Sequence, residues 1–480
     1  MRQYQMFING RFVLGLNGSR TVLNPSTEEV VSEISEASIE QVDQAVQSAA
    51  QVQPSWARRP AIERAAYLRQ ISSKIRGQKE SLARVISEEQ GKVLALSRFE
   101  VEAAADYIDY MAEWARRYEG TILQSDRSRE NIFLFKAPMG VVAGILPWNF
   151  PFFLIARKMA PALVTGNTII IKPSEDTPNN AAEFARIVSE TELPAGVFNL
   201  VCGAGETVGA ALAAHPGIDF VTFTGSVKTG SRIMKAAADN ITKVSLELGG
   251  KAPAIVMDDA NLDVAVKAIH DSRVTNSGQV CNCAERVYVQ EDIAAEFIKR
   301  MTVMMATTPY GDPLQDGVVM GPLINQEQLN KVAWMVEQAV KEGAKIATGG
   351  KKGRQAHGFY YEPTVLINCR QDMDVLHREI FGPVLPIVPF KTLDEAISMA
   401  NDSDYGLTSS IYTQDLDVAM RACNELKFGE TYVNRENSEA IQAFHSGWRR
   451  SGIGGDDGRL GLEEFLQTHA VYIQQTSVQN

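Results

Sequence analysis

The sequence is poor in cysteine and histidine, with 5 and 6 residues among 480. An odd number of cysteines in so long a chain offers no disulfide framework, which favours a reducing compartment such as the cytoplasm. Met1–Gly10 is polar and has no apolar signal core. The most apolar stretch, 141–156, contains prolines and is shorter than the roughly 20 residues of a membrane-spanning helix. We therefore expect a soluble, cytoplasmic protein.

Positive charge is also scarce. Lys and Arg total 47 against 58 Asp and Glu, so the net charge is −11, and no basic block is present. This balance argues against nucleic acid or an anionic membrane surface as a partner. Hydrophobic residues make up 45% of the chain, enough to build large cores, and the length predicts about three domains.

Short β-rich runs alternate with helical runs between residues 140 and 248, which is typical of a parallel sheet covered by helices on both faces. The expected strands are 141–146, 168–172, 197–201, 220–223 and 244–248. Ligands of such sheets bind at the carboxyl ends of the strands. A second α/β alternation follows Lys251. Two isolated β segments, 120–135 and 468–473, need partners and could pair with each other or with another subunit.

Two glycine turns follow expected strands. Gly203, Gly205 and Gly209 form a G-x-G-x-x-x-G pattern, one residue longer than the dinucleotide fingerprint, and tight helix packing explains it equally well. Gly225-Ser226 opens the next helix and offers backbone N–H groups and a hydroxyl to a phosphate. It lacks the Gly-Lys-Ser/Thr ending of a P-loop, which disfavours an ATPase.

Lys172-Pro173-Ser174-Glu175 ends another strand. A lysine and a carboxylate there suit the hydroxyls of a nucleotide ribose, and the carboxylate would repel a 2′-phosphate, which favours NAD over NADP. A surface ion pair is an equally good interpretation of these residues alone.

Cys281 and Glu247 are candidates for chemistry. Cys281 lies in a small, polar, glycine-containing context, where backbone N–H groups can stabilise a thiolate. Glu247 ends an apolar strand before Gly249-Gly250, as a general base would, although it could simply cap a turn. Metal binding by Cys281 and Cys283 is disfavoured because no second ligand pair has suitable spacing. No histidine is close to Cys281 in sequence, which leaves a Cys–His hydrolase open.

Six motifs, in order along nearly the whole chain, resemble the aldehyde dehydrogenase superfamily. They are Pro147-Trp148-Asn149-Phe150-Pro151, Lys172-Pro173-Ser174-Glu175, Phe223-Thr224-Gly225-Ser226, Leu246-Glu247-Leu248-Gly249-Gly250-Lys251, Gly278-Gln279-Val280-Cys281 and Glu379-Ile380-Phe381-Gly382-Pro383-Val384. The one departure is a cofactor helix that begins Val-Lys-Thr-Gly, which changes side chains near the phosphate.

The resemblance implies an α/β aldehyde dehydrogenase fold with three parts. These are a Rossmann-like parallel-sheet NAD-binding domain (1–119 and 137–247), to which a segment (448–466) returns, an α/β catalytic domain (248–447), and a small β oligomerisation element (120–136 and 467–480). It also implies a homo-oligomer, either a dimer or a tetramer.

The resemblance assigns roles to matching positions. Cys281 is the nucleophile, Glu247 the base and Asn149 the oxyanion donor, and no metal is implied. The NAD-binding residues are Pro147, Trp148, Lys172, Ser174, Glu175, Gly205, Gly209, Phe223, Gly225, Ser226, Glu379 and Phe381. The implied reaction is aldehyde oxidation through a cysteine thioester that water hydrolyses. A CoA-acylating relative would be expected to lack Glu247, and a non-catalytic homologue would not need all three catalytic residues.

Three polar residues suggest the substrate. Arg157 follows the Asn149 turn, and Glu439 and His445 lie in a loop that reaches the substrate tunnel in this fold. Such a pocket suits a small aldehyde with an adjacent hydroxyl, and 106–120 with the Arg157 helix resembles the lactaldehyde/glycolaldehyde dehydrogenase branch. Another short aldehyde or semialdehyde is the alternative substrate, and ordinary surface or ion-paired side chains are the alternative interpretation of these residues.

Overall fold

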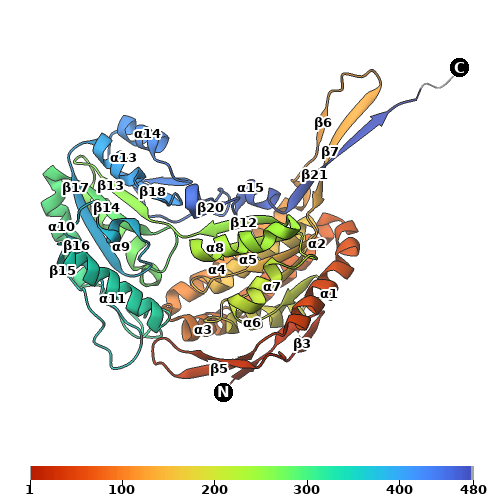
Figure 1. Cartoon of the computed structure of the whole chain (residues 1–480), viewed down its shortest axis with the longest axis horizontal. Coiled ribbons are helices and arrows are strands. Elements are labelled where there is room, and N and C mark those ends of the chain that lie inside the picture. The colour runs from red at the N-terminus through yellow and green to blue at the C-terminus, as the bar shows by residue number, and fades with distance from the viewer. Residues whose placement is uncertain (1, 477–480) are drawn as a thin grey trace.

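Two large sheets organise the computed structural model, which describes residues 2–476 (Figure 1). Each sheet is covered by helices and forms its own lobe. The chain passes from the first lobe to the second through the short turn 249–251, between strands β12 and β13. This turn joins the carboxyl end of β12 in the first sheet to the start of β13 in the second, so the two sheets approach each other here.

The first sheet has five central parallel strands and antiparallel strands at both edges. Its order is β20 (Gly452–Ile453), β12 (Lys243–Leu248), β11 (Phe220–Gly225), β8 (Val141–Ile145), β9 (Thr168–Lys172), β10 (Phe198–Leu200), β2 (Met6–Ile8) and β3 (Arg11–Val13). The five strands predicted between residues 141 and 248 are therefore confirmed. They form the parallel core because their apolar side chains are buried on both faces.

Helices and a small sheet surround this core. The helices are α1 (Ile39–Arg58), α2 (Ala61–Gly77), α3 (Lys79–Gln90), α4 (Leu94–Glu113), η1 (Trp114–Arg116), α5 (Pro151–Thr165), α6 (Asn179–Ser189), α7 (Ala210–Ala213), α8 (Val227–Ala237), η3 (Ala238–Asn240) and α15 (Gly458–Glu463). The small sheet contains β1 (Arg2–Tyr4), β5 (Val30–Ser35) and β4 (Ser19–Leu23). Helix α1 starts with a complete capping box between Ser38 and Gln41, so two of its free N–H groups are satisfied.

The second sheet is parallel except at one edge. Its order is β15 (Lys345–Thr348), β16 (Thr364–Ile367), β17 (Val384–Phe390), β14 (Ala284–Gln290), β13 (Ala252–Val256), β18 (Thr408–Tyr412) and β19 (Glu430–Val433). Its helices are α9 (Leu262–Val274), η4 (Thr275–Gly278), α10 (Glu291–Ala306), α11 (Gln326–Lys341), α12 (Asp374–His377), α13 (Leu393–Asn401), α14 (Leu416–Glu425) and η5 (Arg449–Ser451). The α/β alternation expected after Lys251 is thus confirmed.

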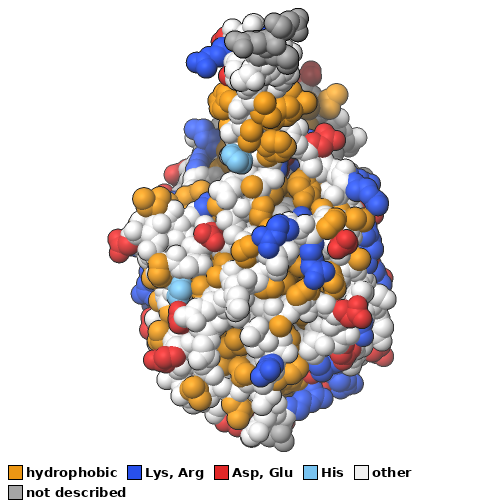
Figure 2. Space-filling model, turned by 90° about the vertical axis from the view of Figure 1, so that its right-hand side faces the viewer, with side chains coloured by type: hydrophobic (Ala, Val, Ile, Leu, Met, Phe, Trp, Pro, Cys, Tyr) orange, Lys and Arg blue, Asp and Glu red, His pale blue; other side chains and the backbone are white. Residues whose placement is uncertain are grey.

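A three-stranded antiparallel arm projects from the first lobe (Figure 1). It consists of β6 (Thr121–Leu123), β7 (Glu130–Pro138) and β21 (Leu466–Gln474). The two isolated β segments of the sequence pair with each other, in register from Leu466 opposite Pro138 to Gln474 opposite Glu130. Apolar side chains gather on this arm, near the top of Figure 2. Residues 477–480 of the expected oligomerisation element lie outside the described residues.

One predicted helix differs from the structure. After the glycine turn at Gly203 the sequence predicts a helix from Glu206 to Ala214. In the structure this segment begins as a wide π-helical turn, Gly205–Gly209, before the single α-helical turn of α7. Glycine at both ends of the wide turn removes the side chains that would otherwise stiffen it.

In residues 2–476, no helix is both long and apolar enough to cross a membrane. The predicted domain boundaries stay a prediction.

Candidate active site

The candidate residues of the first lobe lie along one edge of its sheet. Strand order reverses between β8 and β11, since β9 and β10 follow on one side and β11 and β12 on the other. Such a switch point leaves a crevice at the carboxyl ends of the strands. Asn149 follows β8, Ser226 follows β11 and Glu247 lies near the end of β12.

A cavity of about 550 Å³ opens between this edge and the second lobe. Most of the residues singled out in the sequence line it, from both lobes. They are Pro147, Trp148, Asn149, Arg157, Gly225, Ser226, Glu247, Cys281, Glu379, Phe381, Glu439 and His445. Cys281 also lines the cavity but precedes strand β14. The rule that ligands bind after the carboxyl ends of strands therefore does not predict its position in the site.

The turn before Cys281 has an unusual backbone. Asn276, Ser277 and Gly278 all have positive φ angles of 48°, 59° and 74°, a conformation that costs L-residues free energy. Side chains hold the turn in place: the Ser277 hydroxyl donates to Gly321 O at 2.8 Å, and Ile324 N–H donates to the Gln279 side chain at 2.9 Å. Such anchoring keeps the candidate nucleophile at the cavity wall.

Asn149 is fixed by a buried ion pair from the preceding helices. Its backbone oxygen accepts hydrogen bonds from Lys92 Nζ at 2.8 Å and Asn276 Nδ2 at 3.0 Å. Lys92 pairs with Glu100, and both side chains are fully buried. Glu100 also accepts from the N–H of Phe152 and of Phe153 at the start of α5. The Asn149 amide donates to Gln279 O at 3.1 Å, directly beside the Cys281 turn.

Glu247 is a buried carboxylate without a hydrogen bond. Its side chain is 3% exposed, and neither oxygen has a partner among residues 2–476. Its nearest opposite charge is His445, with Nε2 at 3.7 Å from Oε2. Burial raises the pKa of Glu247 to about 8, although His445 opposes this shift. A carboxyl group that titrates near neutral pH suits a general base.

The double glycine after Glu247 allows two close approaches. A Cβ on Gly249 would lie 2.5 Å from the Glu379 carboxylate, and a Cβ on Gly250 would lie 2.8 Å from Cys281 O. Gly250 N–H donates to Glu379 at 3.0 Å. Both glycines are therefore needed for the turn to contact the Glu379 segment and the Cys281 turn together.

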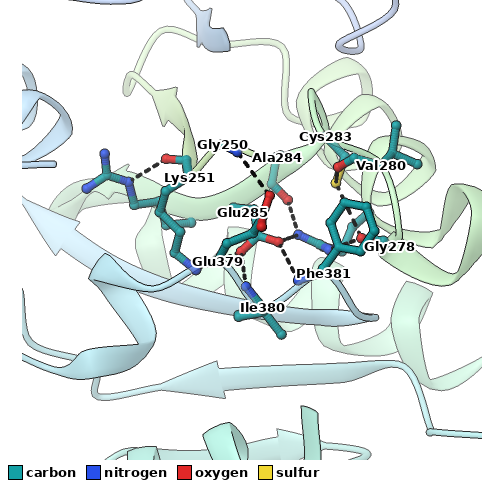
Figure 3. A network of polar contacts seen from close by, with 12 residues as sticks. Gly250, Lys251, Gly278, Val280, Cys283, Ala284, Glu285, Glu379, Ile380 and Phe381 are labelled. Carbon is teal, nitrogen blue, oxygen red and sulfur yellow. Dashed lines mark hydrogen bonds and ion pairs between the residues drawn. The ribbon is translucent and has the colours of Figure 1, made fainter. Parts of the chain in front are cut away.

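A second buried carboxylate, Glu285, joins these segments (Figure 3). It accepts from Lys251 Nζ at 2.7 Å and pairs with Arg273 at 3.0 Å. It also accepts from the backbone N–H of Ile380 and of Phe381, both at 3.0 Å. Arg273 in turn donates to Gly278 O at 2.6 Å. One carboxylate therefore ties the Glu379–Phe381 segment to the Cys281 turn.

The charge of Glu285 is stabilised by its partners. Burial alone would raise the pKa of Glu285, but Lys251 and Arg273 outweigh it and lower the pKa to about 2. Burial lowers the pKa of Lys251 to about 8, which still leaves a cation at neutral pH. The cluster is an ion pair network rather than a set of neutral groups.

Lys172 and Glu175 form a separate group at the end of β9. Lys172 Nζ lies 3.2 Å from Glu175 Oε2, and Gly205 N–H donates to the other carboxylate oxygen. Burial raises the pKa of Glu175, but Lys172 and backbone hydrogen bonds outweigh it, and the net shift is downward. A Cβ on Gly209 would meet nothing within 4 Å, and one on Gly205 would meet only Glu175. Tight packing against a side chain therefore does not explain these two glycines, although Gly209 is itself buried.

The remaining candidate cofactor residues differ in their contacts and in whether they line the cavity. The Ser226 hydroxyl caps α8 by accepting from Thr229 N–H at 3.2 Å, which leaves the helix N-terminus facing the cavity region. Trp148 packs edge-on against Phe381, with ring centroids 5.4 Å apart. Phe223 is buried, and its ring occupies the space that a Gly225 side chain would need. Ser174 accepts from Asp176 N–H at 3.3 Å and does not line the cavity.

Arg157, Glu439 and His445 all line the cavity, but each has a protein partner. Arg157 makes two hydrogen bonds to Asp457 and lies 3.5 Å from Glu439. Asn282 donates to the other Glu439 oxygen. Glu439 is 24% exposed, so its carboxylate is reachable from the cavity. The three residues are not surface residues, but all three take part in ion pairs, as the alternative interpretation expects.

The sequence patterns do not predict several residues of this site. They are Lys92, Glu100, Lys158, Arg273, Glu285, Glu430, Asp456 and Asp457. Glu100 carries a local signal, since it is a charged residue on the face of α4 that also holds the apolar Val101 and Ala104. Asp456 and Asp457 stand out between glycines in the run 454–458. The others carry no local signal.

Removal of Glu285 should destabilise the protein strongly. Glu285→Ala leaves Lys251 and Arg273 buried without their counter-charge, and breaking a buried pair costs about 3–5 kcal/mol. We expect a large fall in the midpoints of thermal and urea unfolding. Arg421→Ala, which breaks an exposed ion pair with Asp394, is the matched control and should leave both midpoints close to those of the parent. Equal midpoints for both variants would contradict this account.

Comparison with known proteins identifies the family. The model of the aldehyde dehydrogenase family matches residues 15–471. The chain is 60% identical over 474 residues to lactaldehyde dehydrogenase of Escherichia coli (strain K12), covering 98% of this chain and 99% of that one. It is 43% identical over 477 residues to 3,6-anhydro-alpha-L-galactose dehydrogenase of Vibrio sp. (strain EJY3), covering 98% and 99%.

Solved structures agree. The crystal structure of lactaldehyde dehydrogenase from Escherichia coli superposes with a TM-score of 0.97 and covers 98% of this chain and 99% of that chain. Betaine aldehyde dehydrogenase from Staphylococcus aureus in complex with NAD⁺ is 35% identical and also has a TM-score of 0.97, covering 99% and 96%. The chain therefore belongs to the aldehyde dehydrogenase family, whose members oxidise aldehydes with a nicotinamide dinucleotide.

Proposed function

We propose that this enzyme oxidises a short α-hydroxyaldehyde, such as lactaldehyde or glycolaldehyde, to its carboxylic acid with NAD. The observation that carries the proposal is the meeting of Cys281, Asn149 and Glu247 with Arg157 and Glu439 in one cavity. The similarity to a lactaldehyde dehydrogenase over nearly the whole chain supports the same substrate class.

Each catalytic residue has a defined task. Cys281 attacks the aldehyde carbon as a thiolate and forms a thiohemiacetal. The Asn149 amide donates a hydrogen bond to the oxyanion, assisted by a backbone N–H. A bound nicotinamide would supply the hydride acceptor for this oxidation. Cys281 then carries a thioester, and Glu247 removes a proton from the water that hydrolyses it. The lone Glu247 carboxylate, which has no hydrogen bond to give up, is free to accept that proton.

The cofactor is NAD in this proposal. The ionised Glu175 accepts from both ribose hydroxyls beside Lys172 and would repel a 2′-phosphate. The N-terminus of α8 at Ser226 binds pyrophosphate, and Glu379 with Phe381 holds the nicotinamide ribose. Pro147 and Trp148 border the same groove. Similar proteins use either cofactor: one 3,6-anhydro-L-galactose dehydrogenase structure contains NAP, and betaine aldehyde dehydrogenase contains NAD⁺.

The charges beside Glu439 in the cavity support a hydroxyl on the substrate. Burial raises the pKa of Glu439, but His445 and Arg157 outweigh it, so the carboxylate stays ionised and can accept a hydrogen bond from a hydroxyl. A semialdehyde would bring a second carboxylate against Glu439. Because Asp457 already pairs with Arg157, that guanidinium is not free to compensate the repulsion. The substrate favoured here is neutral.

The covalent steps can be separated by mutation. Cys281→Ala should abolish NADH formation while NAD still binds. Glu247→Gln should stall hydrolysis, so that mass spectrometry detects a thioester on Cys281 after incubation with aldehyde and NAD. In the parent enzyme, turnover should rise with pH through about 8, the pKa of Glu247, because the carboxylate is the active form. CoA should not be required. An unmodified Cys281 in the Glu247 variant would contradict the assignment.

Cofactor choice should depend on Glu175. The parent enzyme should have a much higher kcat/KM with NAD than with NADP. Glu175→Gln should relax this preference because it removes the charge and keeps the size of the side chain. Glu206→Gln, an exposed carboxylate in the neighbouring turn, is the control and should keep the parent preference. The interpretation fails if the parent uses both cofactors equally well.

Substrate preference should depend on Glu439. A hydrogen bond to a charged group contributes roughly 1.5–3 kcal/mol, which corresponds to about 10- to 150-fold in rate. Glu439→Ala should therefore lower kcat/KM on lactaldehyde and glycolaldehyde by about that factor, and on propionaldehyde much less. Glu436→Ala, in the same loop and half exposed, is the matched control. Equal losses on hydroxylated and plain aldehydes would show that Glu439 does not bind the hydroxyl.

The arm supports assembly into a dimer or tetramer. Ile122, Leu123, Phe135, Tyr472 and Ile473 are 42–71% exposed on its strands, and the free strand edges favour pairing with another chain. Light scattering of the parent at micromolar concentration should give at least twice the chain mass. Ile122→Lys combined with Tyr472→Lys should lower that mass, whereas Leu416→Lys, an exposed apolar residue on α14, should not. A monomeric parent would refute this proposal.

A further inference from the structure

The turn that carries Asn149 leads into helix α5, and the sequence of the helix does not cap its own start. Its N-cap residue, Phe150, makes no side-chain hydrogen bond to the first turn, whose N–H groups have no partner within the helix. Glu100 of helix α4 supplies the missing acceptor. One of its carboxylate oxygens accepts from Phe152 N–H at 2.9 Å and from Phe153 N–H at 3.1 Å. The start of α5 is therefore fixed by a side chain from outside it.

The other Glu100 oxygen holds Lys92, and Lys92 in turn holds the Asn149 turn. The Lys92 ammonium group pairs with Glu100, donates to Asn149 O at 2.8 Å and lies 3.6 Å from the centre of the Phe150 ring. Glu100, Asn149 and Phe150 all line the cavity, whereas Lys92 does not, and its side chain is fully buried. Lys92 therefore braces the wall of the cavity from behind, where it cannot contact a substrate.

Asn149 is also attached to the turn that carries Cys281. Its backbone oxygen accepts a second hydrogen bond from Asn276 Nδ2 at 3.0 Å, and its side-chain amide donates to Gln279 O at 3.1 Å. An amide nitrogen has two N–H groups. One of them fixes the orientation of the side chain, and the second, which has no acceptor among residues 2–476, is left for an oxyanion. Lys92 and the Cys281 turn thus hold Asn149 from the two lobes.

Stability alone does not explain a buried Lys–Glu pair at this place. Taking two charges out of water costs about as much free energy as their attraction returns, and apolar side chains of similar volume often serve a core better. The pair instead opposes displacement, because a shift of Asn149 or of the first turn of α5 would break a hydrogen bond to a buried ion. An oxyanion is stabilised well only by donors that are already held at the right distance.

We propose that Lys92, held by Glu100, is a positioning residue that keeps the Asn149 amide where it can donate to the oxyanion. Lys92 acts through Asn149 and contacts neither the aldehyde nor the dinucleotide. This inference rests on the proposed function, in which Asn149 is the oxyanion donor.

A double-mutant cycle tests this role. Lys92→Met keeps most of the length of the side chain, and combining it with Glu100→Gln leaves no buried charge unpaired. We expect the Lys92→Met/Glu100→Gln variant to lower kcat on glycolaldehyde about tenfold or more with little change in KM, because a misplaced donor weakens the transition state rather than substrate binding. Added to Asn149→Ala, the same two substitutions should lower kcat by less than about threefold, since the donor that they misplace is already absent.

A second measurement shows whether Cys281 keeps its place. Iodoacetamide alkylates a thiolate without forming an oxyanion, so the Lys92→Met/Glu100→Gln variant should alkylate Cys281 at the parent rate. Peptide mass spectrometry follows this reaction in a Cys423→Ser background, which removes the exposed cysteine. Alkylation that is slowed as much as kcat would show that the substitutions displace the nucleophile, and it would count against positioning through Asn149.

The matched control is Lys79→Met/Glu102→Gln, which removes an exposed Lys–Glu pair between α3 and α4 and should keep the parent kcat. A parent-like kcat in the Lys92→Met/Glu100→Gln variant would overturn the proposal, as would equal fold losses from these substitutions with and without Asn149→Ala. If this variant does not fold, the same cycle is measured with Lys92→Met alone, in which the buried Glu100 can take up a proton.

Failure of the proposed function looks different. Asn149→Ala alone would then keep the parent kcat, which contradicts the assignment of Asn149 as the oxyanion donor. A large loss in Asn149→Ala together with additive losses from the Lys92→Met/Glu100→Gln substitutions contradicts only the positioning role of Lys92.

Discussion

The buried carboxylate of Glu285 is the constraint on which the arrangement of the site depends. It lies between two cations, Lys251 and Arg273, and two backbone N–H groups of the 379–381 segment. These four partners belong to three different stretches of chain near the cavity. Because an ion inside a protein is tolerated only when it is fully paired, none of the four can move independently. The segment proposed to hold the nicotinamide ribose and the turn that carries Cys281 are therefore fixed relative to each other.

Buried ion pairs also hold the other walls of the cavity in place. Lys92 and Glu100 hold the Asn149 turn and the start of α5, and Lys158 with Asp456 fixes the loop behind Glu247. Buried ion pairs contribute little net stability compared with apolar packing, but they penalise any displacement of one partner. Such pairs suit a site that must hold groups from two lobes in position to within fractions of an ångström.

The sequence predicts those features that are encoded locally. Apolar runs and glycine turns locate the strands and the ends at which Lys172, Ser226 and Glu247 lie. Family motifs supply Asn149, Cys281 and Glu379. The partners of these residues were not predictable, since Arg157 meets Asp457 across 300 positions and hydrophobic periodicity says nothing about which distant charge faces which. Gly209 was ambiguous in the sequence, and only the structure shows that a Cβ there would meet no packing partner within 4 Å.

Glu247 and His445 are two acid–base groups, with Oε2 of one 3.7 Å from Nε2 of the other. They keep separate functions because their surroundings differ. The pKa of His445, which has a carboxylate on Nδ1, is raised well above its ordinary value. Glu247 has no hydrogen bond, and the nearby imidazolium, Lys158 and Arg157 favour its charged form against the effect of burial. Protonation of one therefore depends on the charge of the other. While His445 remains an imidazolium, Glu247 can be both ionised and unsolvated, which is the state in which a carboxylate most readily accepts a proton from water. The lack of hydrogen bonds at Glu247 would be a defect in a structural residue, and it is what a general base in this position requires.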